Sequence, residues 1–164
     1  MKSSLTMMLL VIIAVAIFTS GCSSAARRAR PLSPRFHLEV RPGQPAIVAE
    51  LPQSETRIRI GARPVLTEYD FADVAVAEVE LGRGLLFQFT PTASTALYRL
   101  TATNLGQRLV LYIGGRPVGA RVIDTVLSDG ALLVLIERPE PELDRLVSGI
   151  RQELAIVSRE LARR

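Results

Sequence analysis

The chain has 164 residues and a formal net charge of +4 at pH 7, a length that suits one small domain with its own core. Aromatic residues make up only 5% of the sequence and tryptophan is absent. The arginines therefore lack the interleaved aromatics of a nucleic-acid surface, and we expect no nucleic-acid partner. A single cysteine, Cys22, excludes an intramolecular disulfide.

The first 21 residues have the order of charged and apolar residues found in an export signal. Lys2 supplies the positive start, residues 7–18 form an apolar segment, and small residues lead up to Cys22. The apolar segment is shorter than the roughly 20 residues of a membrane-spanning helix, which disfavours an uncleaved anchor. We therefore predict a signal peptide over residues 1–21. The alternative is ordinary secretory cleavage near Ala25 or Ala26, which would release the protein.

Ser20 and Gly21 directly before Cys22 resemble the lipobox of bacterial lipoproteins, although Thr19 stands where that motif usually has Leu, Val or Ile. The resemblance implies that the Cys22 thiol carries a diacylglyceryl group and that palmitate-type acylation anchors the protein, facing the periplasm. Two or more acyl chains hold a protein stably on a membrane. Ser23, which is not Asp, further implies the outer membrane in preference to the inner membrane.

A tether is expected over residues 22–35, because arginines, Pro31 and Pro34 lie there without any apolar period. Its arginines either rest on anionic lipid head groups or simply keep a linker soluble. In both cases the folded domain is expected to begin at Phe36.

Three short strands are expected next, over residues 36–41, 46–51 and 56–60, where apolar and polar residues alternate. Pro42-Gly43 marks a turn after the first of them. His37, the only histidine, falls on the polar side of its strand, so we expect an exposed side chain and no metal ligand.

The pattern of apolar and polar residues predicts secondary structure less clearly from residue 65 to residue 84. Residues 65–69 are a candidate strand, followed by a turn over 70–73, a strand over 75–81 and a break at 82–84. Five carboxylates lie here, but their spacing lacks the alternating oxygens and the glycine of a calcium loop. We expect a solvated strand face there. The five are Glu68, Asp70, Asp73, Glu78 and Glu80.

The clearest elements lie after residue 84. Residues 85–90 form an apolar strand, and Pro91 then begins a helix over residues 92–105 that Gly106 is placed to end. The apolar stripe of this helix consists of Ala93, Ala96, Leu97, Leu100 and Leu105.

Three more strands follow, over residues 108–113, 117–123 and 131–137. Gly114-Gly115 predicts a tight hairpin turn between the first two, because such turns need positive φ at both positions. Gly130 closes the turn before the third strand.

Residues 100–106 read Leu-Thr-Ala-Thr-Asn-Leu-Gly, and this stretch resembles the periplasmic head domain of SecD, an accessory subunit of the Sec translocon. In that family a helix ending in Thr-x-x-Asn-x-Gly precedes a strand, a turn and a returning strand. Thr101 and Asn104 carry the match, and the resemblance covers residues 85–155. It implies an α+β fold and an accessory role in protein export or envelope assembly.

The sequence departs from SecD in two ways. Gly114-Gly115 stands where the family commonly has Asp-Gly in the turn. The transmembrane helices that let SecD use the proton gradient have no counterpart in the sequence, so we do not expect a proton-driven motor.

Residues 139–164 are predicted to form a C-terminal amphipathic helix, regular over 140–161, with Pro141 in its first turn. Either its whole apolar stripe packs on the sheet, or the last two turns project and pair with a partner helix or a second copy. The stripe consists of Leu143, Leu146, Val147, Ile150, Leu154, Val157 and Leu161.

Together these elements predict an α+β fold, a mostly antiparallel sheet with two main helices on one face, ferredoxin-like or SecD-head-like, after a signal helix and a flexible tether. Strands within residues 36–60 either extend this sheet or form a small β subdomain. The expected parts are a signal peptide (1–21), a tether (22–35), a β-rich part (36–84), a SecD-head-like core (85–138) and the C-terminal helix (139–164).

We expect no enzyme, because the sequence has no Gly-x-Ser-x-Gly elbow, no P-loop and no zinc-ligand spacing. No catalytic residue, cofactor or metal is predicted, and Cys22 is the one site residue. The expected function is a membrane-anchored periplasmic lipoprotein that binds an envelope protein. The alternative is a lipoprotein that binds a small molecule, a lipid or a cell-wall fragment.

Overall fold

The computed structural model describes residues 31–163, and this part of the chain has the predicted α+β class. Its helices are α2 (Pro91–Thr103) and α3 (Glu140–Leu161). All strand pairs are antiparallel. Between residues 31 and 163, no helix is both long enough and apolar enough to cross a membrane. The strands are β1 (Pro34–Leu38), β2 (Ile47–Glu50), β3 (Arg57–Ile60), β4 (Phe71–Val79), β5 (Gly82–Phe89), β6 (Arg108–Ile113), β7 (Arg116–Val122) and β8 (Ala131–Leu135).

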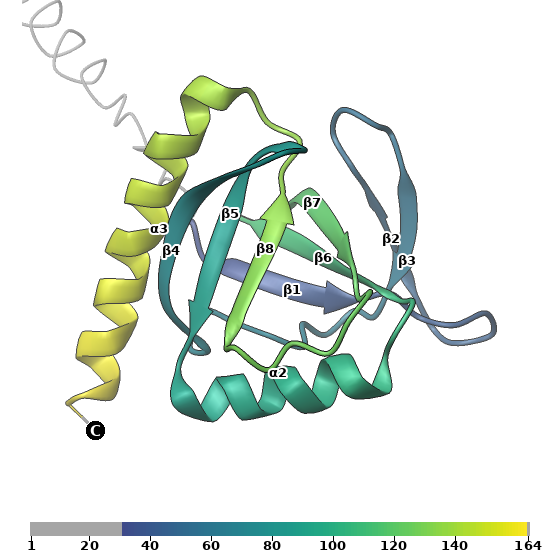
Figure 1. The fold of residues 1–164 in the computed structure, drawn as a ribbon, viewed down its shortest axis with the longest axis horizontal. Helices are drawn as coiled ribbons and strands as arrows, with labels where there is room; N and C mark the ends of the chain where they lie inside the picture. The colour runs from purple at the N-terminus through teal and green to yellow at the C-terminus, as the bar shows by residue number, and fades with distance from the viewer. Residues whose placement is uncertain (1–30, 164) are drawn as a thin grey trace, which may run out of the picture.

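The strands form three sheets instead of the single sheet expected. Their orders are β1-β6-β7, β4-β5-β8 and the hairpin β2-β3. In Figure 1 the two three-stranded sheets lie across one another. They meet at a bridge between Gly119 of β7 and Ile136, beside a hydrogen bond from Glu137 N–H to Val118 O of 2.7 Å. A Cβ at position 119 would overlap the carbonyl oxygen of Leu135, so this close approach requires glycine.

The main core lies between these two sheets and is organised around Phe36 of β1. Its ring makes edge-on contacts with Phe71 and Phe87, at centroid distances of 5.9 and 5.3 Å. Phe89 extends the cluster from Phe71. Such aromatic packing adds roughly 0.5–1.5 kcal/mol per pair beyond the burial of apolar area.

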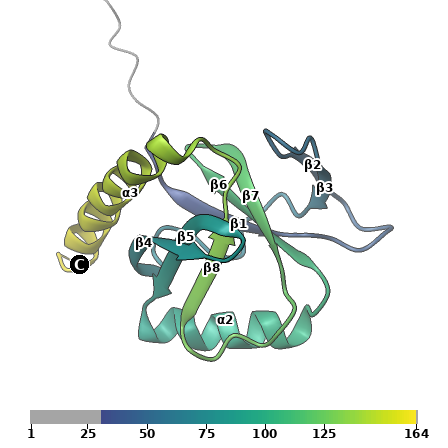
Figure 2. The same ribbon diagram turned by 45° about the horizontal axis from the view of Figure 1, so that its top comes forward.

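After Arg108, strand β6 carries apolar or aromatic side chains on both faces, and both faces are covered by other elements. Leu109 and Leu111 enter the main core, whereas Val110 faces the β2-β3 hairpin. Ile58 and Ile60 of β3 close this second, smaller core. The two alternatives for the N-terminal strands are therefore both realised: β1 joins a main sheet, and β2-β3 is a separate hairpin on the opposite side of the molecule from α3 (Figure 2).

Helix α2 begins where Thr90 Oγ1 accepts a hydrogen bond from Ala93 N–H, with Pro91 in the first turn. It ends at Thr103, two residues before the predicted end, so Leu105 lies outside the helix and is exposed. Ala96, also expected in the stripe, is exposed as well. The buried face consists of Ala93, Leu97 and Thr101.

Helix α3 has the predicted bounds, and its buried side chains run from Leu143 to Leu154. The last two turns are largely uncovered, with Leu161 49% exposed. The reason is the position of the helix along β4: Arg151 pairs with Asp73, near the start of that strand, so the following turns extend past the sheet. The last two turns thus project, as in the second alternative, and their pairing with a partner helix or a second copy stays a prediction.

The two helices cover different sides of the core, which corrects the expectation that they share one face. Helix α3 lies along β4, and α2 crosses the lower ends of the strands (Figure 1). Both sides contribute to one core, since Leu97 of α2 and Ile150 of α3 are fully buried in it.

Several predictions for residues 65–84 are wrong. Leu66 makes only an isolated bridge to Phe36, so residues 65–69 are no strand. The turn lies over residues 67–70, where the Asp70 carboxylate accepts hydrogen bonds from Thr67, and β4 already begins at Phe71. The expected break at 82–84 is absent, since β5 begins at Gly82 and Gly84 lies inside it. Position 84 is glycine because a Cβ there would lie 2.6 Å from the Val134 carbonyl oxygen.

His37 was expected to be exposed, but its side chain is buried, at 8% exposure. Its Nδ1 is 2.9 Å from the carbonyl oxygen of Gly61, and its ring lies 4.8 Å from that of Tyr112. The residue is covered because the chain returns from β3 across this side of β1, a contact that alternation alone does not predict.

Candidate functional site

Cys22, the predicted lipid-attachment site, lies outside the described residues, and its lipidation stays a prediction. Among residues 31–163, no three His, Cys, Asp or Glu side chains are grouped so that they could hold a metal ion. The candidate sites of this part of the chain are therefore its pockets and exposed surfaces.

The carboxylates of residues 68–80 do not converge. Glu68 is buried and paired with Arg35, which corrects its placement on a solvated face. The hydrogen bond from Arg35 holds the pKa of Glu68 below its usual value against the opposing effect of burial. Asp73 binds Arg151 through two hydrogen bonds of 2.8 and 2.9 Å, and these lower the pKa of Asp73. Both pairs fasten elements of the fold together.

The motif that resembles SecD closes α2 and connects it to its surroundings. Thr101 is fully buried; its Oγ1 donates to Leu97 O at 2.9 Å and accepts from Leu127 N–H at 3.0 Å. Gly106, at φ +82°, donates its N–H to Ile123 O at 2.8 Å. These residues are explained by local structure and supply no chemistry.

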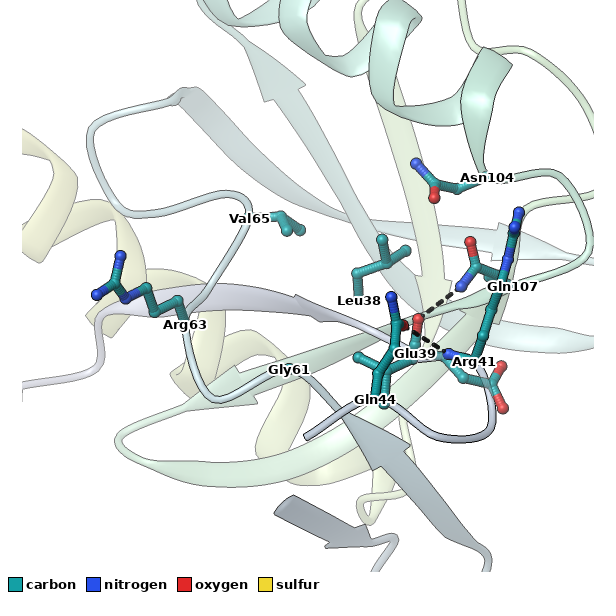
Figure 3. Close-up of a pocket in the computed structure, with 10 residues that line it drawn as sticks. Leu38, Glu39, Arg41, Gln44, Gly61, Arg63, Val65, Asn104 and Gln107 are labelled. Carbon is teal, nitrogen blue, oxygen red and sulfur yellow. Dashed lines mark hydrogen bonds between the residues drawn. The ribbon is translucent and has the colours of Figure 1, made fainter. Parts of the chain in front are cut away.

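A pocket of about 450 Å³ lies beside Asn104, where the end of β1, the loop after β3 and the α2–β6 junction meet (Figure 3). It has an apolar side formed by leucine and valine and a polar side formed by amides and charged groups. Its lining consists of Leu38, Glu39, Val40, Arg41, Gln44, Gly61, Arg63, Val65, Asn104 and Gln107.

The amide of Gln107 is the unusual group in this pocket. Its Nε2 donates to Glu39 O at 2.8 Å, which fixes the orientation of the amide. Its Oε1 is buried and has no hydrogen-bond partner within the described part of the chain. Asn104 donates Nδ2 to Leu100 O at 2.8 Å, and Figure 3 shows the oxygens of the Asn104 and Gln107 amides on facing sides. A hydrogen-bond donor placed beside Gln107 Oε1 would satisfy that atom.

The one carboxylate of the pocket is already committed. Glu39 accepts from Arg108 N–H and Nε at 3.0 Å and from Nη2 at 3.1 Å. A carboxylate held in this bidentate way serves to join β1 to β6. The pocket therefore offers no free carboxylate to act as a base.

A second pocket, of about 370 Å³, lies at the start of β1 and is lined by His37, Tyr112, Arg35 and the β6–β7 turn. Burial raises the pKa of the Tyr112 hydroxyl. His37 and Arg35 are both engaged in the contacts described above. These groups hold β1 in place, which is a structural role.

An apolar groove of about 300 Å³ lies where the tip of the β4–β5 hairpin, β7 and β8 come together. Leu81, at the tip, is 84% exposed, and Val122 is 50% exposed. Arg121 and Asp124 lie at its edge and form an ion pair of 3.1 Å. The groove is formed by Val79, Leu81, Ala120, Val122, Leu133 and Leu135.

Sequence reasoning missed both the pocket at Asn104 and the apolar groove. One signal for the groove was present: Leu81 is a large apolar residue directly before Gly82, in a turn where polar residues are usual. The exposure of Val122 and Leu135 depends on which strands pair, and the sequence does not give that pairing.

No protein-family model and no curated protein matches the chain. Two solved structures resemble its fold, each with a TM-score of 0.59. The first is SecDF, described as a membrane component that enhances protein export; it is 18% identical, and the match covers 75% of this chain and 63% of that chain. The second is SecDF in a super-membrane-facing form, 19% identical, with 75% of this chain and 19% of that chain covered.

This likeness is one of fold, and it confirms the predicted SecD-like fold. The chain spans less than two thirds of the length of either neighbour. A shared fold does not assign a function, since one fold hosts many functions.

Proposed function

We propose that this chain is a non-catalytic protein-interaction module of the cell envelope, anchored to a membrane by lipid on Cys22. The observation that carries the proposal is the apolar groove. A cluster of exposed apolar side chains on a small folded domain is typical of a protein contact site. The SecDF-like fold supports an accessory role in protein export or envelope assembly.

The anchor follows from the signal peptide predicted over residues 1–21 and the tether predicted over residues 22–35, of which Pro34 and Arg35 belong to β1 of the folded domain. The folded part would then face the periplasm, with the outer membrane favoured by Ser23. Metabolic labelling with a clickable fatty acid tests this step: the wild-type chain is expected to carry label, and Cys22→Ala to carry none. Label retained in the variant would refute lipidation at Cys22.

The interaction itself is tested by in vivo cross-linking of the full chain, followed by pull-down from solubilised envelopes. Wild type is expected to recover a defined complex that is lost with Leu81→Glu and with Cys22→Ala. Tyr98→Glu is the matched control, because Tyr98 is 49% exposed and α2, on which it lies, contributes no residue to the groove. If no form of the chain recovers a complex, the module has no stable envelope partner and the proposal fails.

A second candidate function is the binding of a small polar ligand or cell-wall fragment in the pocket at Asn104. The unpartnered Oε1 of Gln107 is the observation that favours it. A soluble cell-wall digest is expected to raise the melting temperature of wild type, and this shift is expected to disappear in Gln107→Leu. No shift with wild type would remove this candidate.

A further inference from the structure

We propose that the occupant of the apolar groove is a second copy of this chain, with Leu81 of each copy inserted into the groove of the other. The inference rests on the proposed function, because it uses the same groove, and it names the partner. It is carried by the shape and the charge of the surface around Leu81.

The surface around Leu81 has a shape that fits the same surface on a second copy. Leu81 projects from the tip of a tight turn, where Gly82 has φ +121°. Directly beside it lies the hollow between Ala120 and Val122 of β7 and Leu133 and Leu135 of β8. A projecting side chain next to a hollow of the same chemistry allows a twofold arrangement in which each copy fills the hollow of the other.

The hollow is held open by the strand arrangement. Strands β7 and β8 touch at the Gly119–Ile136 bridge and part beyond it. In the gap, Arg121 Nη1 donates to Leu133 O at 3.3 Å, which satisfies a carbonyl that a neighbouring strand would otherwise bind. At this carbonyl a partner strand has no free acceptor, and the side chains of the hollow are the surface offered to a second copy.

The charges match in the same twofold arrangement. Glu80 is exposed and precedes Leu81, while Arg121 lines the hollow. Insertion of Leu81 therefore carries Glu80 towards Arg121 of the other copy. Arg121 uses Nη1 for Leu133 O and Nη2 for Asp124, and a guanidinium has five N–H donors, so donors remain for a second carboxylate.

Anchoring adds to this contact. Two copies held by lipid on one membrane meet at a raised effective concentration, so even a small interface becomes populated.

The test uses the full chain carrying two different tags in the same cells, with one tag recovered and the other measured after cross-linking. Glu80→Arg and Arg121→Glu, each expressed under both tags, are expected to lower cross-tag recovery by about tenfold, because each places like charges together. Glu80→Arg under one tag with Arg121→Glu under the other is expected to restore recovery. In that mixed pair, one contact joins the introduced arginine to the introduced glutamate, and the other contact keeps its native Glu80 and Arg121.

Leu81→Glu provides an independent variant, because an exposed turn residue can be replaced with little effect on folding. It is expected to lower cross-tag recovery by at least about tenfold, whereas Tyr98→Glu leaves it unchanged. Thermal unfolding of every variant identifies any that fails to fold. If Arg121→Glu unfolds, Leu81→Glu and Glu80→Arg still decide the question.

The inference is overturned if Leu81→Glu leaves cross-tag recovery unchanged, or if the mixed pair recovers no better than the single variants. Recovery of a different envelope protein through the groove, without a second copy, overturns this inference and leaves the proposed function standing. If neither a second copy nor another protein is recovered, both fail.

Discussion

Glu137, just beyond β8, holds Ser54 in the β2–β3 turn: its carboxylate accepts from Ser54 N–H at 3.0 Å and from Ser54 Oγ at 2.6 Å. Gln53 N–H adds a third hydrogen bond at 2.9 Å. Burial acts to raise the pKa of Glu137, but these hydrogen bonds outweigh it and hold the pKa below its usual value. One side chain thus fastens the separate hairpin to the main fold.

Replacing Glu137 by alanine is expected to loosen the β2-β3 hairpin more than the rest of the molecule. The loss of three hydrogen bonds at a partly exposed site is worth about 1–2 kcal/mol in the free energy of unfolding. Hydrogen exchange should accelerate in β2 and β3 and stay unchanged in β5. Glu142→Ala is the control, because its 3.4 Å contact with Arg138 is exposed. Uniform acceleration in both variants would contradict the local role.

Replacing Glu68 by glutamine is expected to destabilise the fold in a pH-dependent way. Since Arg35 lowers the folded-state pKa of Glu68, the pair stabilises the protein above the unfolded value of about 4.3 and loses this contribution as the pH falls through the folded pKa. At pH 7 the loss should be about 1 kcal/mol, since the Arg35 side chain is half in solvent. Urea unfolding at pH 7 and pH 3 checks this: a gap between wild type and variant that does not shrink at pH 3 would argue against it.

Replacing Gly119 by alanine is expected to cost about 1–3 kcal/mol, because its Cβ would overlap backbone atoms at Leu135 and force the two sheets apart. Gly61→Ala is the matched control, since the nearest atom to its Cβ, Val40 Cγ1, lies 3.7 Å away. Denaturant unfolding of both variants gives the difference. Equal stability of the two would mean that the bridge at Gly119 relaxes freely.

Truncating Ile150 to alanine is expected to cost about 2–4 kcal/mol, because this side chain is fully buried in the main core. Leu161→Ala should change the free energy of unfolding by less than about 0.5 kcal/mol, because Leu161 projects beyond the sheet. Both positions belong to the same apolar stripe, so the pair tests where packing of α3 ends. A large loss at Leu161 would mean that the end of the helix is covered in solution.

Local patterns predicted the regular elements well. The bounds of α3 and β6 match the prediction. An apolar stripe of helical period and an unbroken apolar run each fit only one type of secondary structure, so their ends were well defined. Gly114-Gly115 forms the expected turn, with φ of +59° and +77°. These features depend on residues that lie close together in the sequence.

Long-range arrangement was not predictable in the same way. The burial of His37 depends on Gly61 lying against it, and Gly84 looked like a break because the strand that presses on it, β8, is distant in sequence. The separation into three sheets arises from the crossing at Gly119. For the candidate site, Cys22 was predicted from adjacent residues, whereas the groove is assembled from three strands and a turn.

The position of β1 has a consequence for the order in which the protein can fold. Phe36 pairs opposite Leu111 of β6 and packs between Phe71 and Phe87, so the first strand to be synthesised needs partners that are made much later. Contacts this distant in sequence slow folding, because a long loop must close before they form. Until β6 has left the ribosome, β1 exposes an unpaired apolar edge that can aggregate. The core therefore cannot form until most of the chain has been synthesised. This delay suits a protein that has to stay unfolded for some time after its synthesis begins.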